Sequence, residues 1–167
     1  IKSSKKFTRF LTAFFIFSFS LQTVLFIASY FGVTEIEWAS SSEQTTGLII
    51  SIILIQIIAI LGAILFTKAA EKFGNIVVLT FAIASWSLVC GYAYFITSPI
   101  QFYLIAGFVG LLMGGTQTIA RSTYSLFIPE SKDTTSFFSF YDVTEKIGIV
   151  IGMILYGAAA QITGNVR

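Results

Sequence analysis

The chain has 167 residues, of which 56% are hydrophobic and 11% are charged, and its formal net charge is +2. Soluble domains carry about 25% charged residues, so this composition excludes an ordinary water-soluble domain and indicates a membrane protein. With no histidine and one cysteine, only carboxylates could build a metal site, so we expect no metal and no other cofactor. The small net charge, with no basic stripe outside the loops, also leads us to expect no nucleic-acid partner.

Long stretches without charged side chains predict five membrane-spanning helices, because a helix needs about 20 mostly apolar residues to cross the hydrocarbon core. A transmembrane β-barrel is the alternative, but its strands alternate polar and apolar residues, and LIISIILIQIIAILGAILF does not alternate. We therefore predict an all-α, polytopic membrane helical bundle. The predicted helices are roughly Thr8–Phe31, Thr45–Thr67, Asn75–Ile96, Ile100–Ala120 and Ser139–Ile162.

The first predicted span carries Gln22 near its middle, with Ser18 one turn earlier and Thr23 beside it. Ser18 and Gln22 are four residues apart and therefore lie on one face of a helix. Polar groups inside a bilayer usually face the bundle interior or a water-filled cavity. Gln22 can therefore make a hydrogen bond to a neighbouring helix or contact a substrate, and the sequence leaves both roles open.

The second and third predicted spans differ in polarity. The second holds Gln56, for which a hydrogen bond to another helix is the simpler role and a substrate contact the alternative. The third, Asn75–Ile96, has no Gln, Asp, Glu, Lys or Arg. Because polar groups are costly in lipid, we expect this third span at the lipid-facing periphery and the other four around a polar path.

The fourth predicted span contains Gly110 and Gly114, a G-x-x-x-G step that lets two helices approach closely in lipid. Gln117 and Arg121 follow it, again four residues apart on one face. Arg121 suits the end of a helix, where its charge meets the negative end of the helix dipole. An interface anchor and a gating role both remain open for this pair.

The fifth predicted span has a second step of this kind, Gly148 and Gly152, and three charges at its entrance. Glu145 can stay exposed at the membrane surface. Asp142 and Lys146 are four residues apart, with the acid first, which is the favourable order for an ion pair. Lys146 lies about 10 Å into the predicted helix. It can snorkel back to the interface or face the bundle interior, paired with Asp142.

Alternate loops carry the basic residues, and by the positive-inside rule these loops share the cytoplasmic side. The opposite loops hold acidic residues or no charge. We expect an integral protein of the bacterial inner membrane, and the basic loops predict that the N-terminal end of this chain is cytoplasmic. The basic residues before the first span, between the second and third, and between the fourth and fifth are Lys2, Lys5, Lys6, Arg9, Lys68, Lys72, Arg121 and Lys132.

The sequence has no phosphate-binding loop, no G-x-S-x-G and no H-E-x-x-H motif, so we expect no enzyme.

Residues Gly114–Gly152, GGTQTIARSTYSLFIPESKDTTSFFSFYDVTEKIGIVIG, resemble the junction of the tenth and eleventh helices in the vacuole-effluxer-like branch of the major facilitator superfamily. This branch includes the fungal autophagy-related vacuolar amino-acid effluxers. The matching residues are Gly114, Gly115, Gln117, Arg121, Ser122, Ile128, Pro129, Phe137, Phe138, Phe140, Tyr141 and Lys146.

The resemblance covers nearly the whole chain and implies helices seven to eleven of a twelve-helix fold. Residues 1–167 would be the C-terminal six-helix half, truncated before its last helix. The partner would be the missing N-terminal six-helix half, in a complete protein that is monomeric. The loop after the second span resembles a worn G-x-x-x-D-R-x-G signature, with Thr67 for glycine, Glu71 for aspartate, Lys72 for arginine, and Gly74 retained.

The resemblance also implies a secondary transporter that moves small polar solutes, including amino acids, across a lipid bilayer by alternating access. One departure is that Ser18, Phe19 and Ser20 stand where the branch tends to have Asn-Asp-Gly. The missing acid gives weight to the alternative, a non-transporting membrane scaffold or sensor that retains the fold. The candidate substrate-binding residues are Ser18, Gln22, Thr23 and Gln56. The candidate gating or coupling residues are Glu71, Gln117, Arg121, Asp142 and Lys146.

Overall fold

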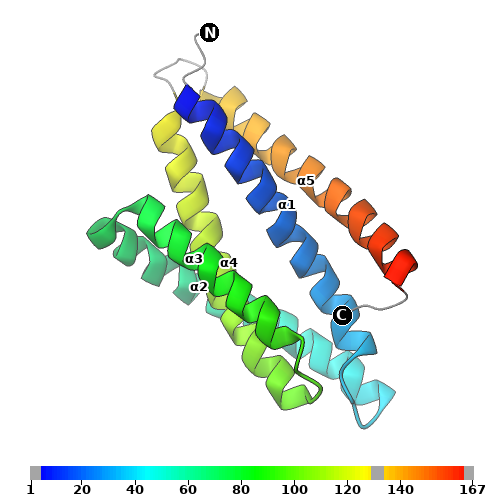
Figure 1. Ribbon diagram of the computed structural model, residues 1–167. Helices are drawn as coiled ribbons and strands as arrows, with labels where there is room; N and C mark the ends of the chain where they lie inside the picture. Colours follow the sequence, from blue (N-terminus) through cyan, green and yellow to red (C-terminus); the bar gives the residue numbers. More distant parts are fainter. Residues whose placement is uncertain (1–4, 129–133, 164–167) are drawn as a thin grey trace. The chain divides into compact units, whose positions relative to one another are not determined.

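The computed structural model describes residues 5–128 and 134–163, and most of these residues lie in helices (Figure 1). Within these two ranges there is no strand, so the predicted all-α class is confirmed. Each of the five predicted spans corresponds to one helix. The helices are α1 (Lys5–Thr34), α2 (Ser41–Phe73), α3 (Asn75–Ala93), α4 (Pro99–Phe127) and α5 (Thr134–Thr163).

Length and apolar composition allow three of these helices to cross a membrane over their described residues. They are α2, α3 and the segment Pro99–Leu126 of α4. In α1 the described apolar segment is shorter, Thr12–Leu21, so the crossings by α1 and α5 stay predictions. Most helices run past the predicted boundaries: α5, for example, begins at Thr134 rather than Ser139.

A capping serine, Ser40, sets the start of α2, and a glycine, Gly74, sets its end. At its start, the hydroxyl of Ser40 accepts a hydrogen bond from the backbone N–H of Glu43 (3.1 Å), and the Glu43 carboxylate accepts one from the N–H of Ala39 (3.0 Å). This reciprocal arrangement resembles a capping box. At its end, Gly74 adopts φ +88°, and its N–H donates to the carbonyl of Ala70 (2.8 Å). A positive φ favours glycine, so the helix stops at Phe73, six residues after the predicted end at Thr67.

The chain divides into two compact units. The α1/α5 unit comprises Ile1–Tyr30 and Tyr124–Arg167, and the α2–α4 unit comprises Phe31–Thr123. Helices α1 and α4 each contribute residues to both. We describe each unit separately.

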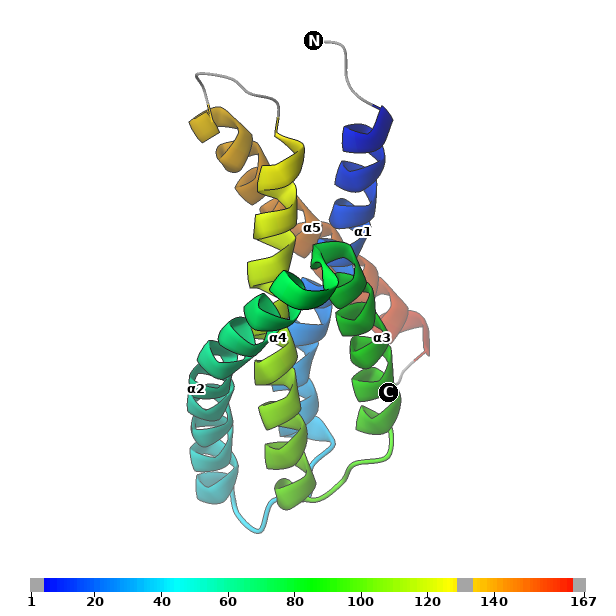
Figure 2. The ribbon, with the colours of Figure 1, turned by 90° about the vertical axis from the view of Figure 1, so that its left-hand side faces the viewer.

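In the α2–α4 unit, α4 is the central helix. Figure 2 shows it between α2 and α3. In its apolar 18-residue segment 50% of the residues are buried, against 17% in the corresponding segment of α3 and 11% in that of α2. Gly110 and Gly114 of α4 lie directly on the α2 backbone at Ile55 and Ala59. The G-x-x-x-G step is therefore a helix–helix contact, as its spacing predicts.

Helix α3 buries a single stripe, Val78, Ala82 and Trp86, and leaves most of its surface exposed. The indole N–H of Trp86 donates a hydrogen bond to the hydroxyl of Thr116 on α4 (3.3 Å). The lipid-facing position expected for the third span stays a prediction. The still lower burial of α2 was not expected, because its Gln56 suggested an interior helix.

In the α1/α5 unit, a second glycine contact joins two helices. Gly148 of α5 lies against the backbone of Phe19 on α1, and Gly152 lies against Thr23. Aromatic rings from α1, α4 and α5 pack together in this unit. Phe14 and Tyr141 stack with their ring centroids 4.3 Å apart, Tyr124 packs on Tyr141, and the Tyr124 hydroxyl donates to the carbonyl of Phe137 (2.8 Å).

Candidate functional site

The predicted substrate residues of α1 lie in the α1/α5 unit. Ser18 is buried, with 5% of its surface exposed. Thr23 is half-buried, and its hydroxyl donates a hydrogen bond to the carbonyl of Phe19 (2.7 Å), one turn earlier in the same helix. Its neighbour on α5 is Gly152. The side chain of Gln22 lies outside the described residues, so its role stays a prediction.

The charged pair of α5 lies on the face turned away from α1. Helical residues advance by about 100° each, so Asp142 and Lys146 point away from the side of α5 that carries Tyr141 and Gly148. Both charged side chains are exposed. Lys146 lies about 18 Å along the helix from Thr134, at 1.5 Å per residue. No salt bridge joins Lys146 to Asp142 or to another described residue.

Gln117 and Arg121 continue the stripe of α4 that begins with Gly110 and Gly114. These four residues are spaced by three or four positions and therefore share one helix face. The two glycines contact α2, whereas Gln117 and Arg121 are exposed. Along α4, the exposed polar side chains thus begin where the close contact with α2 ends.

A hydrogen bond ties α3 to α4 next to this polar end. The side-chain amide of Asn75, the first residue of α3, donates to the hydroxyl of Ser122 (3.2 Å). Ser122 follows Arg121 directly. This pair was not among the predicted site residues. The only signal was the presence of Ser122 in the matching motif, and nothing local points to a partner 47 positions away.

The two candidate residues of α2 are both exposed, Gln56 in mid-helix and Glu71 near the C-terminal end. Gln56 shares its face with exposed isoleucines, among them Ile52 and Ile60. Its amide makes no hydrogen bond to any described residue. The interhelical hydrogen bond expected for Gln56 is therefore not formed within the described part of the chain.

The candidate residues thus separate into two sets. One set, Ser18, Thr23, Asp142 and Lys146, lies in the α1/α5 unit, and the other, Gln56, Glu71, Gln117 and Arg121, lies in the α2–α4 unit. Within each unit, glycine contacts hold helices together, while amide and charged side chains remain exposed beyond the residues that make those contacts. Such groups can offer hydrogen bonds and charge to a polar solute. Among the described residues, no group of three or more His, Cys, Asp or Glu side chains could hold a metal ion.

An all-helical chain with long apolar helices and polar groups beside glycine contacts fits a polytopic membrane protein. The sequence matches the vacuole effluxer Atg22-like family over residues 1–167, and the chain belongs to this family. The resemblance identified from residues Gly114–Gly152 is therefore confirmed.

The relatives include bacterial and fungal proteins. The chain is 30% identical to the uncharacterized MFS-type transporter YxiO of Bacillus subtilis, over 93% of the chain and 35% of that protein. It is 28% identical to autophagy-related protein 22 of Eremothecium gossypii and 29% identical to that of Saccharomyces cerevisiae, each over 95% of the chain. The chain therefore spans about a third of the length of these relatives. No solved structure matches it.

Proposed function

We propose that the complete protein is a secondary transporter that moves small polar solutes across a membrane by alternating access. Membership of the effluxer family supports transport, as does the similarity to a protein named as an MFS-type transporter. The chain would supply helices seven to eleven of twelve, in the C-terminal half. Amino acids are the first solutes to test, because the resemblance is to amino-acid effluxers.

The observation that carries this proposal is the exposure of charged and amide groups deep in apolar helices. Lys146 and Gln56 both lie well inside long helices and are exposed, and burying such groups in hydrocarbon is costly. We propose that both groups face a water-filled path or the helices of the other half. Polar and ionisable side chains within membrane spans mark substrate and ion pathways.

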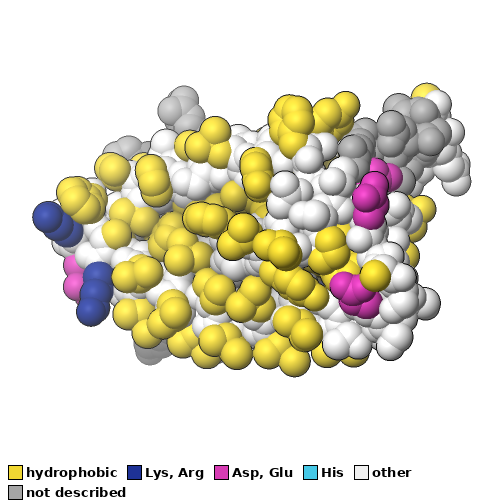
Figure 3. Space-filling view, turned by 90° about the horizontal axis from the view of Figure 1, so that it is seen from below, with side chains coloured by type: hydrophobic (Ala, Val, Ile, Leu, Met, Phe, Trp, Pro, Cys, Tyr) yellow, Lys and Arg dark blue, Asp and Glu magenta, His cyan; other side chains and the backbone are white. Residues whose placement is uncertain are grey.

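We propose a cytoplasmic location for the basic ends of the helices. On α2, Glu43 lies near the start, while Lys68 and Lys72 lie near the end. On the face shown in Figure 3 hydrophobic side chains predominate, and charged side chains appear at its two ends, with Lys and Arg at one end only. The positive-inside rule places the basic end in the cytoplasm. A bacterial inner membrane is proposed because one of the relatives is a bacterial protein.

The direct test is solute uptake by the full-length protein in proteoliposomes, with variants Gln22→Met and Lys146→Met. Each variant removes a polar group while keeping a side chain of similar length. We expect at least a tenfold loss of uptake with normal folding. Gln161→Met is the matched control, since Gln161 is an exposed glutamine near the end of α5. Uptake that stays unchanged in both test variants would remove these residues from the site.

The same assay separates transport from the alternative role as a scaffold or sensor. That alternative rests on Ser18, Phe19 and Ser20 in place of the Asn-Asp-Gly of relatives. Well-folded full-length protein that moves no solute or proton under any gradient, across a panel of amino acids and other small polar solutes, would favour the scaffold or sensor.

A further inference from the structure

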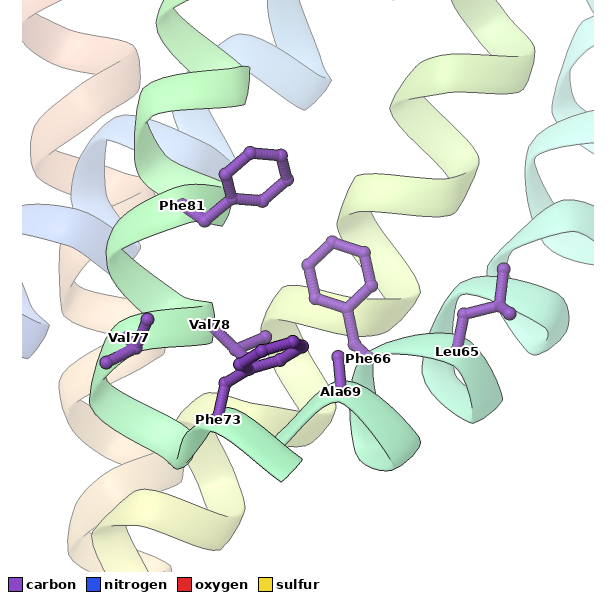
Figure 4. A pocket seen from close by; sticks show the side chains of 7 residues that line it. All are labelled: Leu65, Phe66, Ala69, Phe73, Val77, Val78 and Phe81. Carbon is purple, nitrogen blue, oxygen red and sulfur yellow. The ribbon is translucent and has the colours of Figure 1, made fainter. Parts of the chain in front are cut away.

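Two neighbouring hollows run along the side of α3 in the α2–α4 unit. The first, of about 410 Å³, lies between α2 and α3. The second, of about 570 Å³, extends along α3 and α4. Both are lined by Phe66 and Phe81, so they adjoin. We name the two together the α3 groove. Figure 4 shows the first hollow, in which Phe66, Phe73 and Phe81 point into the space between the helices. The residues that line it are Leu65, Phe66, Ala69, Phe73, Val77, Val78 and Phe81.

The lining of the α3 groove is almost entirely apolar. In the second hollow, the hydroxyl of Ser85 donates to the carbonyl of Phe81 (2.9 Å), so this polar group is already satisfied. The groove therefore suits an apolar occupant. Along α3 it extends from Val77 to Tyr92, about 22 Å at 1.5 Å per residue. One lipid leaflet covers about half of a 30 Å hydrocarbon core, so the groove can accept a whole acyl chain.

Two lysines, Lys68 and Lys72, lie at one end of this groove. The ammonium of Lys72 lies 5.2 Å from the ring centroid of Phe73, which lines the first hollow. Lys68 is four residues earlier, on the same face of α2 as Lys72, and both lysines are exposed. Glu71 is also exposed at this end and offsets one of the two charges. The other end of the groove, near Tyr92 and Leu104, has no charged lining residue.

We propose that the α3 groove binds an anionic phospholipid, with an acyl chain along α3 and the phosphate beside Lys72 and Lys68. Apolar lining alone would accept any lipid. The lysines at a single end select a negative headgroup, because basic residues at a membrane surface attract anionic lipids. This assignment does not depend on transport, so it can fail or succeed independently of the proposed function.

The test is native mass spectrometry of the full-length protein with phosphatidylglycerol and phosphatidylcholine supplied in equal amounts. We expect phosphatidylglycerol to be retained preferentially. The double variant Lys68→Gln, Lys72→Gln should lose this preference, by about fivefold for each lysine at most. The control is Lys5→Gln, Lys6→Gln, which removes the same charge from the start of α1. Equal retention of both lipids by the unmodified protein, or equal effects of the two double variants, would overturn the proposal.

A second pair of variants tests the groove itself. The side chain of Val77 lines the first hollow and is 60% exposed, whereas its neighbour Ile76 is 64% exposed and does not line it. Val77→Trp should reduce phosphatidylglycerol retention several-fold by filling the groove, and Ile76→Trp should not. If neither tryptophan changes retention, another part of the complete protein covers the groove and the lipid assignment is wrong.

Discussion

In each of the two units, a pair of glycines four residues apart forms the contact between two helices. The helix backbones approach more closely at Gly110 than at Gly148. In the α2–α4 unit, a Cβ atom at Gly110 would lie 2.6 Å from the carbonyl oxygen of Ile55. In the α1/α5 unit, a Cβ at Gly148 would lie 3.3 Å from the backbone of Phe19. The first contact has no room for a methyl group, because a Cβ at 2.6 Å would overlap a backbone atom, whereas the second contact needs a shift of only a few tenths of an ångström. The α2–α4 contact should therefore be the more rigid of the two and the more sensitive to substitution.

The largest expected effect is at Gly114, whose Cβ would collide with the backbone of Ala59. Gly114→Ala should destabilise the full-length protein by about 3 kcal/mol, because the backbone of α2 must move. Thermal unfolding in detergent measures this loss. Gly91→Ala is the matched control, since a Cβ there would meet nothing within 4 Å. It should stabilise α3 by about 0.5 kcal/mol. Equal effects of the two substitutions would remove the argument for a rigid contact.

A smaller effect is expected at Gly152, where the obstacle is a side chain. A Cβ there would collide with the hydroxyl of Thr23, which can be removed by mutation. Gly152→Ala should cost about 2 kcal/mol, and Thr23→Ala in the same protein should restore most of the loss. A double-mutant cycle on unfolding free energies measures this coupling. Purely additive effects would show that Thr23 and Gly152 do not touch in the complete protein.

The sequence predicted the helices well because apolar length and charge gaps are local properties. It predicted their ends poorly. In α2, the predicted span ends at Thr67, just before the charge of Lys68, but long basic side chains can reach the interface from within a helix. The helix ends at Phe73 because Gly74 adopts a positive φ. Glycine just past an apolar helix is a known stop signal, so this end could have been predicted from the sequence.

The site was less predictable, because its geometry depends on how each helix is rotated about its axis. Sequence spacing showed that Gln117 and Arg121 share a face, but not that this face is the one through which Gly114 meets α2. Spacing also could not show that α5 turns Lys146 away from α1. The contact between Asn75 and Ser122 joins two helices whose approach no local pattern encodes.

The smallest expected effect tests whether polar contacts add to the rigidity of the α2–α4 unit. Trp86→Phe removes the hydrogen bond to Thr116 (3.3 Å) while keeping an aromatic ring in the buried stripe of α3. The Thr116 hydroxyl still donates to the carbonyl of Leu112 (2.5 Å), so no buried group loses its last partner. Hydrogen bonds between membrane helices are worth about 0.6 kcal/mol on average. A double-mutant cycle with Thr116→Val should give a coupling of this size. A coupling of about 2 kcal/mol or more would mean that this polar contact, rather than the glycines alone, makes the unit rigid.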